Sequence, residues 1–209
     1  MKHVVLLGDS IFDNAAYVGN APDVVRQVRQ RLPHGSKATL GAVDGGTTED
    51  VRKQLRHLPA DATHLIVSAG GNDALGYVDF LGAPAKSTAE ALLGLADIAA
   101  EFEDKYREML TEVLACGLPT AICTIYYPRF PDPDLQRIAT AGLTVFNDCI
   151  IRAAFTHCLP LLDLRLICTE EGDYADPIEP SAQGGEKIAN VLVELLEHGF
   201  ATSRTEVFT

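Results

Sequence analysis

A short apolar run near the amino terminus ends abruptly in Gly-Asp-Ser, and this junction limits the folds open to the chain. Residues 4–7 read V-V-L-L, which is typical of a strand buried on both faces of a parallel sheet. Gly8 and Asp9 end this run and place Ser10 on the following turn. Open α/β sheets hold their chemistry at the carboxyl ends of strands, so Ser10 is a candidate nucleophile. A serine that merely caps a helix is the alternative.

The rest of the chain alternates strand and helix patterns. We expect further strands at residues 38–43, 65–68, 120–125 and 161–164. We expect helices at residues 23–31, 47–58, 89–116, 135–157 and 188–196, with loops at 79–88 and 126–134. Residues 89–116 could form one long helix or two shorter ones. Alternation of this kind requires parallel crossovers. The sequence therefore predicts an α/β fold, a three-layer α/β/α sandwich of the flavodoxin-like type whose mainly parallel sheet has about five strands.

Length and charge restrict the domain organisation and the partners. The 209 residues suit a single domain over residues 1–209, with a polar tail at 201–209 that is either flexible or docked elsewhere. A formal net charge of -12 disfavours nucleic acid and anionic membranes as partners. We expect a small-molecule partner, no nucleic acid and no stable membrane insertion. The oligomeric state is left open.

The cysteines and the amino terminus indicate the compartment. The five cysteines form no C-x-x-C pair and lie near no histidine pattern typical of zinc. We expect buried free thiols, with one disulfide as the alternative, no metal and no cofactor, and a reducing compartment. Residues 1–3 run directly into the first strand without a cleavage site, so the cytoplasm is the expected location.

Three turns that carry polar or glycine residues follow three expected strands. Ser10, Gly45 and Asn72 each come after the carboxyl end of a strand, so they should meet at one edge of the sheet. The Ser10 and Gly45 N–H groups and the Asn72 amide could stabilise the oxyanion that forms when a serine attacks a carbonyl. The alternative is that Gly45 and Asn72 are only turn residues.

These blocks resemble the GDSL or SGNH hydrolase family. Residues 8–11 read G-D-S-I, Gly45 lies in D-G-G-T-T, and residues 70–73 read G-G-N-D. The resemblance spans residues 8–189 and implies a serine esterase or lipase-like hydrolase with Ser10 as its nucleophile.

The last block of the family is Asp-x-x-His, and here the chain departs from it. Asp176 matches the aspartate, but Glu179 stands where the family has its catalytic histidine. We expect no other histidine to replace it, because all six precede expected strands or follow expected helices, at the edge opposite Ser10. These are His3, His34, His57, His64, His157 and His198.

Glu179 can act as the base only if its carboxyl group holds a proton well enough. An ordinary glutamate is a weak base at neutral pH. Burial and the nearby Asp176 would raise the pKa of Glu179, whereas the amino terminus of the last helix would lower it. Asp176 would orient Glu179 or modulate its charge. The alternative is a solvated acidic pair before a helix.

Other polar residues near these blocks are weaker candidates. Asp9, Asp73 and Arg129 are candidates for substrate binding, although an arginine in a Pro-rich loop is usually solvated. Asp13 and Asn14 are expected to bond local backbone.

The leading functional hypothesis is hydrolysis of a small carboxylic ester through an acyl-serine intermediate, with activity that rises with pH through a carboxylate transition. Transfer of the acyl group to an alcohol or thiol acceptor is an alternative. A second alternative is a catalytically impaired protein that binds an acylated or anionic ligand. Phosphate binding at residues 45–46 is weaker, because both nucleotide-binding glycine motifs are absent.

Overall fold

The computed structural model describes residues 1–200 and 203–209, and a parallel sheet forms its centre. Six strands lie in the order β2-β1-β3-β4-β5-β6, and every neighbouring pair is parallel. The strands are β1 (His3–Gly8), β2 (Lys37–Leu40), β3 (His64–Ser68), β4 (Thr120–Cys123), β5 (Leu161–Leu162) and β6 (Val207–Phe208). The expected α/β fold with a parallel sheet is confirmed.

The α-helices are α1 (Val24–Arg31), α2 (Thr48–Gln54), α3 (Gly71–Leu75), α4 (Thr88–Ala115), α5 (Pro133–His157), α6 (Leu164–Ile167) and α7 (Ala182–His198). Short 3-10 helices cover η1 (Leu55–His57), η2 (Val78–Gly82) and η3 (Glu171–Asp173). Capping side chains fix the residues at which several helices begin. Asp23 accepts from the Arg26 N–H before α1, and Ser181 accepts from two N–H groups before α7.

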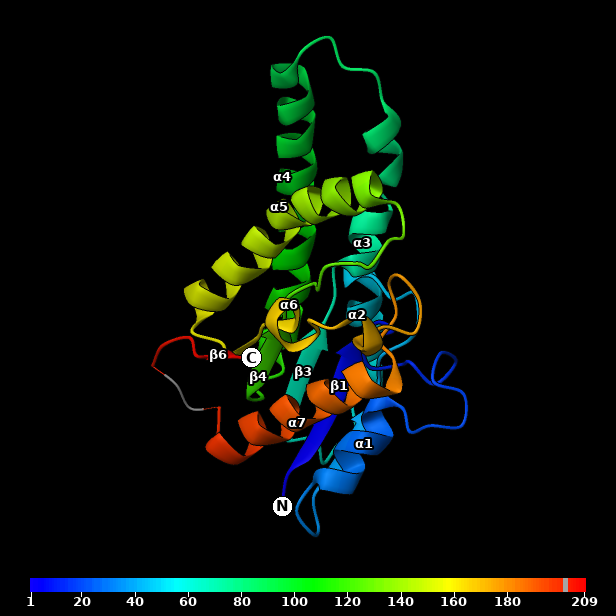
Figure 1. Ribbon diagram of the computed structural model, residues 1–209. Helices are drawn as coiled ribbons and strands as arrows, with labels where there is room; N and C mark the ends of the chain where they lie inside the picture. Colours follow the sequence, from blue (N-terminus) through cyan, green and yellow to red (C-terminus); the bar gives the residue numbers. More distant parts are fainter. Residues whose placement is uncertain (201–202) are drawn as a thin grey trace.

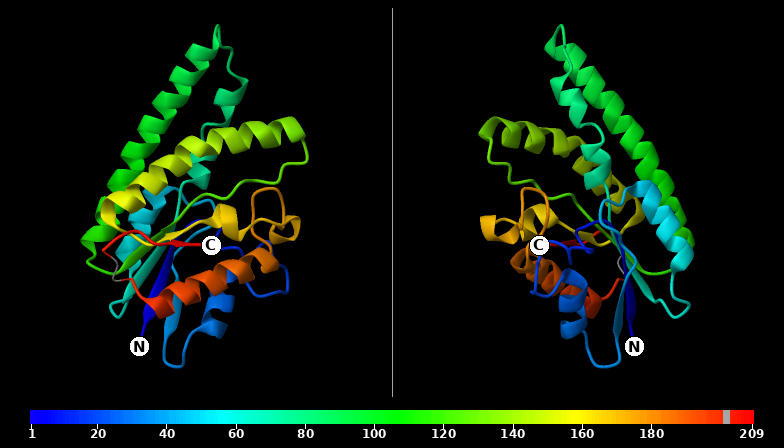
Figure 2. Two further views of the ribbon diagram at one scale, coloured as in Figure 1. Left: turned by 60° about the vertical axis from the view of Figure 1, so that its left-hand side comes forward. Right: turned by 90° about the vertical axis from the view of Figure 1, so that its right-hand side faces the viewer.

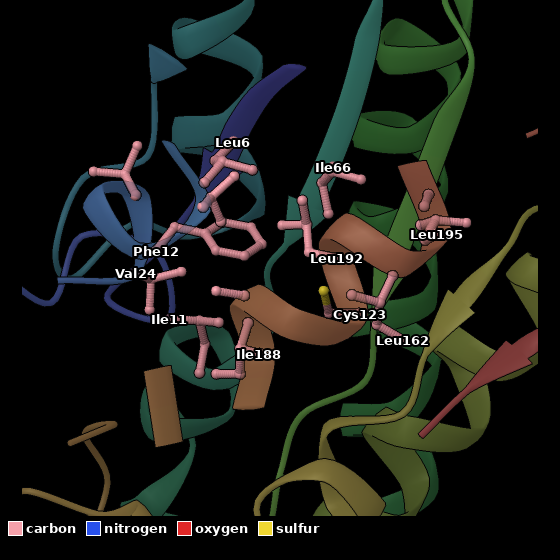
Figure 3. Packing of buried hydrophobic residues seen from close by; sticks show 14 of the residues in the cluster. Leu6, Ile11, Phe12, Val24, Ile66, Cys123, Leu162, Ile188, Leu192 and Leu195 are labelled. Atoms are coloured by element: carbon pink, nitrogen blue, oxygen red, sulfur yellow. The ribbon is translucent and has the colours of Figure 1, made fainter. Parts of the chain in front are cut away.

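The first strand shows how the sequence sorts the helices into two layers. All six residues of β1 are buried, so both faces of the strand carry apolar side chains. Val4 and Leu6 belong to one core cluster and Val5 and Leu7 to the other, because successive side chains of a strand point to opposite faces. Helices α1 and α7 pack on the first face, as the labelled side chains in Figure 3 show.

The second face is covered by α2, α4 and α5, whose buried residues include Val51, Phe102 and Phe146. The sheet therefore lies between two helical layers (Figure 1). The amino-terminal part of α4, with the segment before it, projects far beyond the strand ends (Figure 2). Helix α5 crosses α4 and reaches out with its own amino-terminal end.

The carboxyl-terminal half differs from the expected elements at its last two strands. Of the tail at 201–209, for which the sequence left a flexible and a docked state open, Val207 and Phe208 pair with Leu161 and Leu162 as β6. Residues 201–202 of that tail lie outside the described residues. The fifth strand is shorter than the predicted 161–164, because Asp163 caps α6 through the Arg165 N–H and so ends the strand.

Helix α5 is unusually apolar for a surface helix. Among the described residues it is the only helix long and apolar enough to cross a membrane by composition, with a mean hydropathy of 1.3. Its Phe146, Cys149 and Ile150 are buried in the core cluster that α4 shares. This half of α5 therefore belongs to the core of the fold.

Candidate active site

Ser10 leaves the sheet through a turn that only glycine can form. Gly8, the last residue of β1, has φ +125°, and a Cβ there would lie 1.6 Å from the Ser68 carbonyl oxygen. The side chain of Gln54 clamps this glycine, since its amide accepts from the Gly8 N–H at 2.8 Å and donates to the Gly8 carbonyl at 2.8 Å. The backbone next to the serine is therefore fixed by contacts from β3 and α2.

Ser10 lines a cavity of about 390 Å³ at the carboxyl edge of the sheet. Asp9, Asn72 and Glu179 line the same cavity. The remaining walls are mainly apolar and include Leu95, Ile98, Ile125, Phe130, Leu143 and Phe146. The structure thus brings Ser10, Asn72 and Glu179 to one space, with polar groups confined to one part of it.

Two backbone donors at the carboxyl edge of the sheet lack a protein partner in the part of the chain that the structure describes, although Gly45 does not line the cavity that holds Ser10. Within the described residues, the N–H groups of Ser10 and Gly45 have no hydrogen-bond partner. Gly45 has φ +76°, a conformation that suits glycine. The Asn72 amide donates to the Gly46 carbonyl at 3.0 Å, which holds it against this turn and leaves its second N–H available.

Glu179 is a buried carboxyl group with one oxygen that lacks a hydrogen-bond partner in the described structure. Glu179 is 7% exposed, and its Oε2 atom has no hydrogen-bond partner within the described part of the chain. Burial raises the pKa of Glu179 to about 7, and the charges of Asp44 and Asp176 add to this rise. A side-chain hydrogen bond with Ser10 acts in the opposite direction. At neutral pH the group therefore exchanges protons readily.

The loop that carries Glu179 is held from several sides. Asp176 Oδ1 accepts from the N–H groups of Ile178, at 2.9 Å, and Glu179, at 3.0 Å. Asn14 donates to the Pro180 carbonyl at 3.1 Å, and the Tyr126 hydroxyl donates to the Ile178 carbonyl. Asp176 is exposed, so it shapes the turn before Glu179 through the backbone and raises the pKa by its charge.

Asp9 is a second buried carboxyl group in the cavity. It is 4% exposed, and its Oδ1 accepts from the Ile11 N–H at 3.2 Å. Burial raises the pKa of Asp9 to about 7, against the effect of this bond and of Ser68, and the charge of Glu179 adds to the rise. Each carboxylate therefore disfavours ionisation of the other.

Two of the weaker candidates are directed away from the cavity. Asp73 accepts from the Thr48 N–H at 3.0 Å and from its hydroxyl at 2.7 Å, so it caps α2. The Arg129 guanidinium donates to the Thr169 carbonyl at 2.6 Å and lies over the Tyr174 ring. Neither lines the cavity that holds Ser10. Their expected role in substrate binding stays a prediction, and contacts with Thr48 and Thr169 occupy the two groups in this structure.

Asp13 and Asn14 bond backbone as expected, but the partners are distant in sequence. Asp13 accepts from the Asp44 N–H at 3.0 Å, 31 residues away. Asn14 reaches the Glu179 loop at Pro180, as described above. These two residues connect the serine turn to the loops of the other site residues, so they position the site.

The histidines lie where the sequence placed them. His3 and His64 are the first residues of β1 and β3, at the edge opposite Ser10. The His3 ring bonds Asp61 and Thr39, each at 2.8 Å. None of the six histidines lines the Ser10 cavity. Glu179 is thus the titratable side chain that contacts the Ser10 hydroxyl in the described structure.

Sequence reasoning missed Gln54 and the extent of the apolar cavity. Gln54 lies inside the helix expected at residues 47–58, and nothing in its spacing connects it to Gly8. The apolar walls come from elements far apart in sequence, between Leu75 and Phe146. The only signal was the run of exposed leucines in the expected helices, which resembles an ordinary amphipathic face.

Comparison with known proteins agrees with this geometry. A parallel sheet between two helical layers, with a cavity at its carboxyl edge, defines a three-layer α/β protein with the SGNH-hydrolase fold. The chain belongs to the GDSL-like Lipase/Acylhydrolase family, whose model matches residues 6–187. A search among curated proteins gave no significant match in sequence.

Several solved structures share the fold. An extracellular lipase from Streptomyces rimosus is similar, with 18% identity, TM-score 0.63 and coverage of 95% of this chain and 99% of that chain. A lipase/acylhydrolase from Enterococcus faecalis has 19% identity, TM-score 0.65 and coverage of 97% and 100%. A GDSL-family lipolytic protein from Veillonella parvula has 11% identity, TM-score 0.69 and coverage of 95% and 100%. Family membership supports hydrolase activity.

Proposed function

We propose that the protein hydrolyses a carboxylic ester of an apolar acid through an acyl-serine intermediate on Ser10, with Glu179 as the general base. One observation carries this proposal: a buried carboxyl group with an unpartnered oxygen shares a cavity with the candidate nucleophile. Burying such a group without a partner costs stability. We infer that the protein keeps this buried carboxyl group, despite its cost in stability, because it takes part in catalysis.

In the acylation step, Glu179 removes the proton from the Ser10 hydroxyl while Oγ forms a bond to the ester carbonyl carbon. The carbonyl π electrons move onto oxygen, which the N–H groups of Ser10 and Gly45 and the Asn72 amide stabilise. Collapse of this intermediate breaks the bond to the alkoxide, which takes the proton from Glu179 and leaves as an alcohol.

Deacylation repeats these steps with water. Glu179 removes a proton from water as its oxygen attacks the acyl carbon, and the bond to Ser10 Oγ then breaks. The proton on Glu179 returns to Ser10, and the acid leaves. An alcohol or thiol acceptor in place of water would give transfer of the acyl group. Asp176 contributes as a positioning residue, because it holds the turn that carries Glu179.

The acyl group is expected in the apolar part of the cavity, between α3, α4 and α5. Of the described residues that line this space, Asp9 and Glu179 are the only ones with an ionisable carboxyl group. An apolar acyl chain gains from this lining, whereas a charged one loses hydration without gaining a counter-charge.

The test is hydrolysis of a short-chain nitrophenyl ester by the wild type, Ser10→Ala, Glu179→Gln and Glu179→His across pH. The pKa of about 7 lies where a histidine also titrates, so the position of the pH transition alone does not identify the base. We expect Ser10→Ala and Glu179→Gln to lose activity and the wild type to gain it through about pH 7. Glu194→Gln, an exposed carboxylate on α7, is the matched control.

The result that would overturn the proposal is an inert wild type that becomes active as Glu179→His. In that case the pocket is retained without its base, and binding of an acylated ligand becomes the function to pursue. That second function is favoured by one observation, the absence of a histidine from the described lining of the cavity.

A further inference from the structure

Exposed apolar side chains gather around the mouth of the Ser10 cavity. Among the residues that the structure describes, seven of the twelve exposed large hydrophobic residues lie on α3, η2 and the first turns of α4 and α5. These segments form the part of the molecule that projects beyond the strand ends (Figure 2). A concentration of this kind on one surface marks an interaction site more often than scattered leucines do.

On α4 the apolar side chains form one continuous stripe that runs out of the core. Phe102 is fully buried, Ile98 and Leu95 line the cavity, and Leu92 is 60% exposed. Steps of three and four residues place all of them on the same helix face. Leu93, beside this stripe, is 66% exposed. The helix thus continues its core face into solvent, where no described residue covers it.

A matching stripe lies on α5. Phe146 is 4% exposed, Leu143 lines the cavity, and Ile138 and Leu135, one and two turns further out, are 48% and 37% exposed. The two stripes meet in the core and separate toward solvent. The cavity lies between them, so the apolar surface outside is continuous with the apolar wall inside.

We propose that this surface docks on an uncharged or zwitterionic lipid-like assembly that contains the ester substrate. The proposal rests on the proposed function, because it supplies the substrate to Ser10. Continuity with the cavity favours this occupant, since a lipid chain can pass from the assembly into the space beside Ser10. A protein partner, such as a second copy of the chain, would instead cover the mouth and block entry.

Charge selects the kind of lipid surface. The segments around the mouth carry Lys86 and Arg137 but also Asp79, Glu90 and Asp97. The whole chain has a net charge of -12. An anionic surface would repel this face, and binding must come from burial of the apolar side chains.

The test measures binding without turnover. Ser10→Ala protein is mixed with phosphatidylcholine vesicles and separated by flotation. We expect it to float with the vesicles, and enrichment of the vesicles in phosphatidylserine should weaken binding. Adding Leu92→Ser and Leu93→Ser should reduce the partition coefficient by about tenfold or more. The matched control adds Phe155→Ser and Leu166→Ser, which are 56% and 58% exposed but lie on other surfaces, and should bind like the parent.

Activity keeps this proposal separate from the proposed function. In protein that keeps its native Ser10, the double variant Leu92→Ser and Leu93→Ser should hydrolyse a soluble short-chain ester at the wild-type rate. Neither residue lines the cavity. Absence of vesicle binding by the parent, or equal binding by the two double variants, overturns the docking proposal. The docking proposal is also overturned if analytical ultracentrifugation shows that the parent is a dimer and that Leu92→Ser with Leu93→Ser makes it a monomer. An inactive wild type that still floats would contradict the proposed function alone.

Discussion

Replacing the buried carboxyl group of Glu179 by an amide should stabilise the protein at alkaline pH. The pKa of this group rises from 4.5 to about 7 because burial disfavours its charged form. A raised pKa in the native state means that the native protein holds the proton more tightly than the unfolded chain does. The stability contributed by that proton is complete below pH 4.5 and is lost as pH rises through about 7.

The shift sets the size of the effect. A rise of this extent corresponds to at most about 3 kcal/mol between the two protonation states. Coupling with Asp9, whose pKa also rises to about 7, and partial screening by solvent reduce the expected gain to about 2 kcal/mol. Glu179→Gln has no charge to bury, so it should exceed the wild type by this amount at pH 8. At pH 4 the two proteins should be equally stable.

Urea unfolding at both pH values checks this prediction, with Glu194→Gln as the control for loss of one exposed carboxylate. The control should follow the wild type at each pH. If Glu179→Gln shows no gain in the free energy of unfolding at pH 8, the carboxyl group is not buried as a charge. The physical basis for its role as a base would then be removed.

Three further predictions concern the residues that build the site. Gly8→Ala should destabilise the fold by several kcal/mol, because its Cβ would meet the Ser68 carbonyl; thermal melts would show this, and Gly82→Ala, which meets nothing within 4 Å, should be tolerated. Asn72→Ala should lower kcat/KM of ester hydrolysis by about 10²–10³-fold with a normal circular dichroism spectrum. Gln54→Ala should lower the free energy of unfolding by about 2 kcal/mol, because it leaves two backbone groups of Gly8 without partners. A Gln54→Ala variant as stable as the wild type would show that the clamp is dispensable.

Much of the fold could be predicted from local patterns. The buried residues 4–7 of β1 and 65–67 of β3 read as continuous apolar runs, and the parallel pairing of the two strands follows from the helices between them. The edge strand β6 could not be predicted, since two residues at the end of a polar segment carry no periodicity. Val207 and Phe208 are extended because they hydrogen-bond to the otherwise unpaired edge of β5.

The candidate site shows the same division. Ser10, Asn72 and Glu179 could be predicted to share one edge, because each follows a strand or precedes a helix there. The direction of the Glu179 pKa shift could not, since the sequence allowed effects of either sign. Burial decided it, and burial depends on tertiary contacts such as the bond from Tyr126 to the Ile178 carbonyl. The contacts of Asp73 with Thr48 and of Arg129 with Thr169 could not be predicted for the same reason, because these partners are distant in sequence.

The measurement that tests the central claim most directly is the rate at which a fluorophosphonate probe labels the protein across pH, with the labelled peptide identified by mass spectrometry. The claim predicts that Ser10 is labelled in the wild type at a rate that rises through about pH 7. Glu179→Gln should be labelled at least about 10²-fold more slowly, and its labelling rate should show no transition near pH 7. Labelling of Glu179→Gln at the wild-type rate, or at a residue other than Ser10, would contradict it.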